Sequence, residues 1–285
     1  MGRDLTLSFV DFASSGPRGP GYGPPFVGHV TMWIVWLAWG IAAFAADPLV
    51  DKTEDVLSDA GRQKLHARFD AAVGKLTADI ERSPKTVELY SRRGDLHFFR
   101  GQFTAAVRDY EKMVELRPET EASHWRRGIA YFYAERTQDA IRQWDLYSTF
   151  DDVDRENGIW RFLSQVKAHD VKTARDGLLK YKQDDREPFP DVYAMFAGKL
   201  SGDDLIARID RASLSKAERE KRLFYAHLYV GLLDGVENRR EPAIEHLREA
   251  TSNAWGRDAG YGPNFMWHVG RLHHDLLIRA AKRDK

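Results

Sequence analysis

From about Val50 onward, hydrophobic residues recur at intervals of three and four positions along most of the chain. This spacing places them on one face of an α-helix, whereas a half-buried strand alternates apolar and polar residues, and no convincing alternating run is present in the sequence. Pro84, Gly101, Pro118 and the acidic stretch 151–154 interrupt the pattern, as residues that end helices do. The chain is therefore predicted to be all-α and built from helix pairs with short connections.

Small and aromatic residues recur within this pattern with a period of 34 residues. The matching positions are Gly94 and Gly128, Ala106 and Ala140, and Tyr110 and Trp144, with Ala72, Leu76 and Pro84 as a partial earlier copy. Such a period is the signature of the tetratricopeptide repeat, in which two antiparallel helices approach closely at small residues and an aromatic residue fills the space beside them. The repeats predict an α-α superhelix.

The regularity of the repeats sets the expected domain organisation. Residues 1–45 are expected to form a leader, and residues 46–285 one repeat domain. The parts of this domain are a partial repeat at 53–86, clear repeats at 87–120 and 121–154, degenerate pairs over 155–253 and a capping helix at 263–283. Ser201 is a predicted helix N-cap. In the last pair, either Ala226 or Gly231 could fill the small position.

The leader has the pattern of an exported protein. A Gly/Pro-rich stretch precedes the apolar, uncharged run Val30–Ala46, which ends in the small-x-small pattern of residues 43–45. These features predict a secretory signal peptide cleaved before Ala46, with translation starting at Met1 or Met32. The expected location is extracytoplasmic, in the periplasm or secreted from a bacterium, and the alternative is an uncleaved N-terminal membrane anchor.

Composition and motifs point away from several function classes. Lys+Arg and Asp+Glu both number 43, so the charge offers no argument for nucleic-acid binding or for an anionic membrane, and membrane contact is expected only if the leader is uncleaved. There is no Cys, and the ten His residues lack metal-ligand spacing. No nucleophile or phosphate-loop motif is present. We expect a non-enzymatic protein without a cofactor or metal; the alternative is a metal-binding or hydrolytic enzyme on a helical frame.

The order of elements resembles that of the family of the periplasmic lipoprotein NlpI and its secreted tetratricopeptide relatives in bacteria. The resemblance covers roughly residues 55 to 275, and its segments are "HWRRGIAYFYAERTQDAIRQWDLY", "IWRFLSQV", "VYAMFAGKLSGDDLIARI" and "FYAHLYVGL…AIEHLREA". It implies an adaptor that holds partner proteins at the cell envelope and often self-associates. The chain departs from the lipoprotein pattern because it has no Cys for lipid attachment.

The first helices of stacked pairs line a concave surface, and their residues are the candidate binding groove. The predicted groove residues are Arg92, Asp95, Phe98, Trp125, Arg126, Ile129, Phe132 and Tyr133. They do not match the Lys and Asn positions of a carboxylate clamp. An aromatic groove edged by two Arg suits a protein or peptide segment with apolar anchors and some acidic character. A homo-oligomer is a further possibility.

Export can be tested by sequencing the N-terminus of the native protein. The apolar run followed by Ala-Phe-Ala predicts a mature chain that begins at Ala46. A mature protein that still begins at Met1 or Met32 would contradict cleavage and favour the anchor.

Overall fold

The computed structural model describes residues 49–183 and 185–284, so the predicted leader and its cleavage site lie outside the described residues. Within these two ranges every regular element is a helix and no strand occurs, which confirms the all-α prediction. Among the helices described, none combines the length and the apolar character that crossing a membrane requires.

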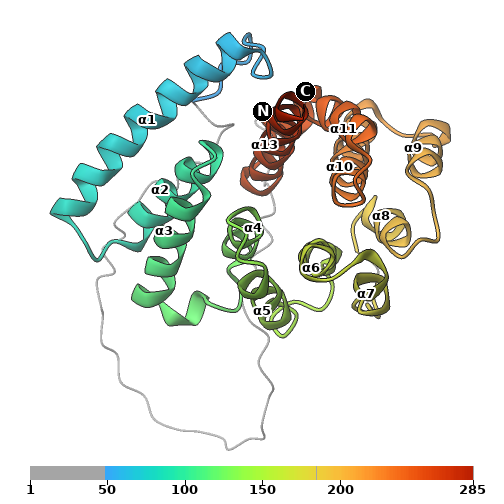
Figure 1. The fold of residues 1–285 in the computed structure, drawn as a ribbon, viewed down its shortest axis with the longest axis horizontal. Helices are drawn as coiled ribbons and strands as arrows, with labels where there is room; N and C mark the ends of the chain where they lie inside the picture. Colours follow the sequence, from blue (N-terminus) through green and yellow to red (C-terminus); the bar gives the residue numbers. More distant parts are fainter. Residues whose placement is uncertain (1–48, 184, 285) are drawn as a thin grey trace, which may run out of the picture. The chain divides into compact units, whose positions relative to one another are not determined.

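Helices follow one another along the chain with short connections, and most neighbours in sequence pack together (Figure 1). In chain order they are α1 (Asp59–Arg82), α2 (Val87–Phe99), α3 (Phe103–Leu116), the 3-10 helix η1 (Pro118–Thr120), α4 (Trp125–Tyr133), α5 (Thr137–Tyr147), α6 (Arg155–Ala168), α7 (Val171–Asp176), α8 (Phe189–Phe196), α9 (Gly202–Arg211), α10 (Lys216–Val236), α11 (Arg240–Ser252), α12 (Ala254–Asp258) and α13 (Tyr261–Arg283).

Several helix ends differ from the predicted ones, and others agree. Residues 53–86, the expected partial repeat, contain the single long helix α1. Helix α7 ends at Asp176, where Gly177, a poor helix former, follows it, so the second half of the third predicted pair is short. The short helix α12 was not predicted. Ser201 is the N-cap of α9, and its hydroxyl accepts a hydrogen bond of 3.0 Å from the N–H of Asp204.

Three helix pairs share one close approach between a glycine of the first helix and a large side chain sixteen residues later in the second. A Cβ atom built on the glycine would lie 2.7 Å from Tyr110 at Gly94, 2.6 Å from Trp144 at Gly128 and 2.7 Å from Leu247 at Gly231. The expected contact of Gly128 with its paired helix is confirmed, with Trp144 as the nearest neighbour. Gly231 therefore takes the small position of the α10–α11 pair.

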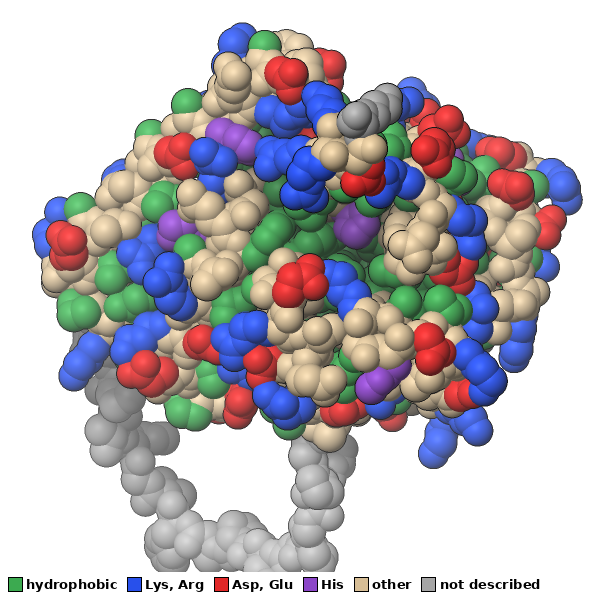
Figure 2. Space-filling view, in the orientation of Figure 1, with side chains coloured by type: hydrophobic (Ala, Val, Ile, Leu, Met, Phe, Trp, Pro, Cys, Tyr) green, Lys and Arg blue, Asp and Glu red, His purple; other side chains and the backbone are tan. Residues whose placement is uncertain are grey.

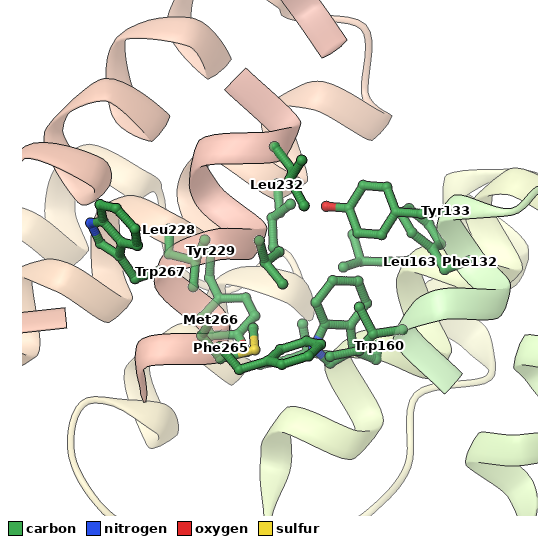
Figure 3. Close-up of a cluster of buried hydrophobic side chains, with 14 of the residues drawn as sticks. Phe132, Tyr133, Trp160, Leu163, Leu228, Tyr229, Leu232, Phe265, Met266 and Trp267 are labelled. Carbon is green, nitrogen blue, oxygen red and sulfur yellow. The ribbon is translucent and has the colours of Figure 1, made fainter. Parts of the chain in front are cut away.

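The last helix, α13, closes the fold by packing against α2 as well as α10, α11 and α12. The ring of Phe265 stacks on that of Phe98 with 4.9 Å between centroids, and His268 stacks on Phe99 at 3.9 Å. Figure 3 shows Phe265 and Met266 of α13 in one hydrophobic cluster with side chains of α4, α6 and α10. The C-terminal helix is therefore part of the core.

Because Gly128 lies so close to Trp144, we expect even the addition of one methyl group at this position to destabilise the fold. Gly128→Ala should lower the free energy of unfolding by about 1–3 kcal/mol, because overpacking against Trp144 outweighs the gain in helix propensity. Gly74→Ala in α1 is the matched control, since no atom lies within 4 Å of its added Cβ, and it should stabilise by roughly 0.5–1 kcal/mol. Urea denaturation measures both; equal shifts in the two variants would contradict the argument.

Candidate functional site

The residues predicted to line an open groove occupy the expected helices but are mostly covered. Trp125 and Arg126 are partly buried, Arg92 is exposed, and the buried members are Asp95, Phe98, Ile129, Phe132 and Tyr133. Phe98 and Phe132 have no exposed surface at all. A partner therefore cannot reach most of this set in the conformation described.

Helix α13 covers this face. Phe265 contacts Trp125 edge-to-face at 4.9 Å between ring centroids, in addition to its stacking on Phe98. The Tyr133 hydroxyl is hydrogen-bonded to Nδ1 of His273 at 3.0 Å, and burial lowers the pKa of His273 to about 4, so this imidazole is neutral. The aromatic side chains of the first helices are thus largely bound by the chain's own C-terminal helix.

Arg126 is held in a buried polar cluster and does not edge an open groove. Its guanidinium lies 2.6 Å from Oδ1 of Asp95 and is within 5.2 and 5.4 Å of the ring centroids of Tyr110 and Tyr261. Both tyrosine hydroxyls donate hydrogen bonds of 2.6 Å to the Asp95 carboxylate. Since its charge is already paired, Arg126 gives no reason to expect an acidic partner.

A cavity of about 290 Å³ lies beside this cluster, where α4, α5, α6, α10 and the start of α13 meet. Two of the predicted groove residues, Trp125 and Ile129, belong to its lining. The other lining residues are Trp144, Tyr147, Asp154, Glu156, Asn157, Trp160, Arg186, Tyr225, Gly262, Pro263 and Met266. This cavity, with five aromatic residues among its thirteen lining residues, is the candidate functional site.

Two buried N–H donors of the cavity lining lack a hydrogen-bond partner among the described residues. They are Nε1 of Trp144 and Nδ2 of Asn157, and the two side chains belong to residues that are only 1% and 2% exposed. Leaving a buried donor unpaired costs free energy comparable to a lost hydrogen bond, so proteins rarely do so without a reason. Because the two nitrogen atoms are themselves buried, a group in the cavity would reach them only after a side-chain movement.

Acidic side chains surround a single guanidinium at one end of the cavity. Arg186 pairs with Glu156, with Asp154 at 3.2 Å and with Asp185 at 3.1 Å, and it lies 4.3 Å from the centroid of the Phe189 ring. Burial raises the pKa of Glu156 to about 7, although Arg186 acts in the opposite direction. Burial raises the pKa of Asp154 as well.

The Glu156 carboxylate is held in position by two helices and a loop. It lies in the first turn of α6, where the helix dipole favours a negative charge, and Asp154 is the N-cap of the same helix. The Tyr229 hydroxyl of α10 donates a hydrogen bond to one oxygen of the Glu156 carboxylate. Arg186, which lies in the loop before α8, pairs with the other oxygen. The cluster is therefore built from three separate segments of the chain.

On the face of the molecule drawn in Figure 2, charged and hydrophobic side chains occupy different regions. Lys, Arg, Asp and Glu side chains of both signs cover the outer part of the face in Figure 2, and hydrophobic side chains gather in a hollow near its middle. In residues 49–183 and 185–284, no group of three or more His, Asp or Glu side chains is arranged to hold a metal ion.

Neither a protein-family model nor a curated protein matches this chain in sequence.

The buried cluster around Arg126 predicts a stability defect. Asp95→Ala removes the main acceptor of a guanidinium whose side chain is 13% exposed, and breaking such a buried pair costs about 3–5 kcal/mol. Glu88→Ala in the same helix is the matched control, because its pair with Arg117 is on the surface and is worth about 0–1 kcal/mol. Denaturant unfolding of both variants measures the difference. If Asp95→Ala costs no more than Glu88→Ala, Arg126 is not held as described.

Proposed function

We propose that the protein is a non-enzymatic, extracytoplasmic scaffold that binds a segment of a partner protein in the cavity bounded by α4, α5, α6, α10 and α13. The proposal includes a tetratricopeptide-type superhelix, related in its order of elements to the NlpI-like proteins. It retains the predicted location in the periplasm or outside the cell. Self-association into a homo-oligomer is compatible with it.

The repeated glycine contact supports the repeat assignment. The same sixteen-residue spacing and the same close approach occur in α2–α3, α4–α5 and α10–α11, although the last pair is far from the others in sequence. A shared local geometry of this kind is expected where one supersecondary unit is repeated. The spacing cannot be attributed to a single accidental contact.

The cavity is the observation that carries the binding function. Its wall includes residues of α4, α6 and α10, each of which is the first helix of its pair, and first helices line the concave surface in repeat proteins. Concave sites with mostly apolar walls and a few convergent polar groups are typical of ligand and peptide binding. A volume of about 290 Å³ suits one or two side chains of a bound segment.

One observation favours the alternative of an enzyme. Glu156 lies in a cavity, and its pKa of about 7 is the value that a general acid or base needs near neutral pH. The two oxygens of its carboxylate, however, are engaged by Tyr229 and Arg186. Turnover of a bound peptide by the wild-type protein that Glu156→Gln abolishes would support this alternative against the scaffold.

Site-specific photocrosslinking in the native cell tests the scaffold. A benzoyl-phenylalanine at Trp125, an aromatic residue of the cavity wall, should crosslink to a second envelope protein. The same group at Phe150 is the control, because that side chain is 62% exposed and is not part of the cavity lining. Crosslinks from Phe150 alone, or from Trp125 only to another copy of this chain, would overturn the proposal.

A further inference from the structure

We propose that the first turn of α13, residues 261–264, is a displaceable cover over α2 and α4, and that a tyrosine of the partner segment takes the place of Tyr261. This inference rests on the proposed function and adds to it how the predicted groove opens and which side chain the partner presents. Three observations support it: the contacts of Tyr261, the few interactions that hold its turn, and the position of this turn beside the cavity.

Tyr261 lies on residues of the predicted groove in the way that a bound side chain would. Its hydroxyl donates a hydrogen bond of 2.6 Å to Oδ2 of Asp95. Its ring centroid lies 5.4 Å from the guanidinium carbon of Arg126 and 6.3 Å from the centroid of the Trp125 ring. Tyr261 itself is 39% exposed, so it covers these groove residues from the solvent side.

The turn that carries Tyr261 is held by few interactions of its own. Gly260 is the N-cap of α13 and has no side chain that could accept a hydrogen bond, and the first turn contains no acidic residue. Gly262 follows in the helix, where glycine is less favourable than alanine, and Pro263 has no N–H to donate. The local sequence therefore stabilises this helix start only weakly.

Packing requires neither of the two glycines. A Cβ atom built on Gly260 or Gly262 would have no atom within 4 Å, whereas one on Gly128 would lie 2.6 Å from Trp144. The backbone gives no reason either, because Gly260 has a φ of −63°. Sequences depart from local preferences mainly at functional sites, and segments that open belong to the least stable parts of a structure. The two glycines therefore indicate a turn that opens.

The same turn forms part of the wall of the cavity. Gly262 and Pro263 line the cavity, so displacement of residues 261–264 would widen it. The widened site would extend to Asp95 and Arg126, which Tyr261 now contacts. The cavity and the predicted groove would then form one continuous site.

The later turns of α13 are anchored independently of the cover. The indole N–H of Trp267 donates a hydrogen bond of 2.7 Å to the carbonyl of Thr251, and Trp267 is 1% exposed. Phe265 stacks on Phe98. The first turn can therefore be displaced while the remainder of the helix keeps its place in the core.

The groups that Tyr261 would leave behind define the partner's side chain. Its departure removes a hydrogen-bond donor from the buried carboxylate of Asp95 and an aromatic ring from the guanidinium of Arg126. Tyrosine supplies a hydroxyl donor and an aromatic face of the same dimensions. Phenylalanine lacks the donor, and an acidic side chain would be repelled by Asp95. The partner segment is therefore expected to present a tyrosine.

Peptide binding to the full chain tests the side-chain requirement without altering the protein. The probes are fluorescently labelled, capped heptapeptides with the sequence of residues 258–264, and versions with phenylalanine or alanine in place of the tyrosine. In anisotropy titrations the tyrosine peptide should bind, and the phenylalanine peptide should bind about tenfold more weakly because a hydrogen bond to a charged acceptor is lost. The alanine peptide should bind more weakly still.

Two variants should shift the cover in opposite directions. Tyr261→Phe removes the hydrogen bond to Asp95 and should raise the affinity for the tyrosine peptide about tenfold, because the open population increases. The double variant Gly260→Ser, Gly262→Ala adds a cap and a better helix former, and it should lower the affinity about fivefold.

Each variant has a matched control, and thermal melts establish that all of them are folded. The Tyr131 hydroxyl also donates a hydrogen bond to a carboxylate, that of Glu111 at 3.0 Å, and Tyr131 is not part of the cavity lining. Gly74 in α1 likewise has no atom within 4 Å of an added Cβ. Tyr131→Phe and Gly74→Ala should leave peptide binding unchanged. The comparison of peptides on the wild-type protein depends on none of these variants.

The outcomes separate this inference from the proposed function. Equal binding of the tyrosine and phenylalanine peptides, or no peptide binding even to Tyr261→Phe, would overturn the inference and leave the scaffold in place. An effect of Tyr131→Phe as large as that of Tyr261→Phe would do the same, as would a partner crosslink at Trp125 that is undiminished by Gly260→Ser, Gly262→Ala. Absence of any partner crosslink at Trp125 would overturn the scaffold itself.

Discussion

The packing of Phe265 between Phe98 and Trp125 is the contact on which the architecture depends. It joins the last helix to two of the first ones, so that α13 is a shared core element of helix pairs that are distant in sequence. In a simple repeat array each unit contacts only its neighbours, and stability is a sum of local terms. The contact between α2 and α13 adds a long-range term. We therefore expect cooperative unfolding of the described helices rather than unravelling from one end.

The sequence predicts the helical class and the glycine contacts because both depend on local spacing. A period of three to four fixes which face of a helix is buried, and the glycine of each of the three pairs meets the side chain sixteen residues later. The sequence was less informative about which helix covers the groove. One signal was available: four of the five consecutive residues in the run "FMWHV" of α13 are apolar and point to different sides of the helix, which is typical of a segment that is buried on several sides.

The cavity could not be predicted, because its wall comes from five helices and a loop. Asp154 and Glu156 look like ordinary first-turn acids at the start of a helix, and Arg186 lies in a stretch without periodicity. Only the fold brings them together and buries Glu156 enough to raise its pKa. Arg126 shows the opposite case: the spacing places it on a helix, but the fold pairs it with Asp95, to which the distant Tyr261 also donates a hydrogen bond.

The contact between α2 and α13 has a consequence for biosynthesis. Arg271 donates a hydrogen bond to the carbonyl of Phe99, 172 residues earlier, and Phe265 of α13 packs on Phe98 of α2 and on Trp125 of α4. While the ribosome still holds the C-terminal residues, the emerging pairs expose this aromatic surface, which is prone to aggregation. We therefore expect the nascent chain to leave this surface exposed until α13 has emerged.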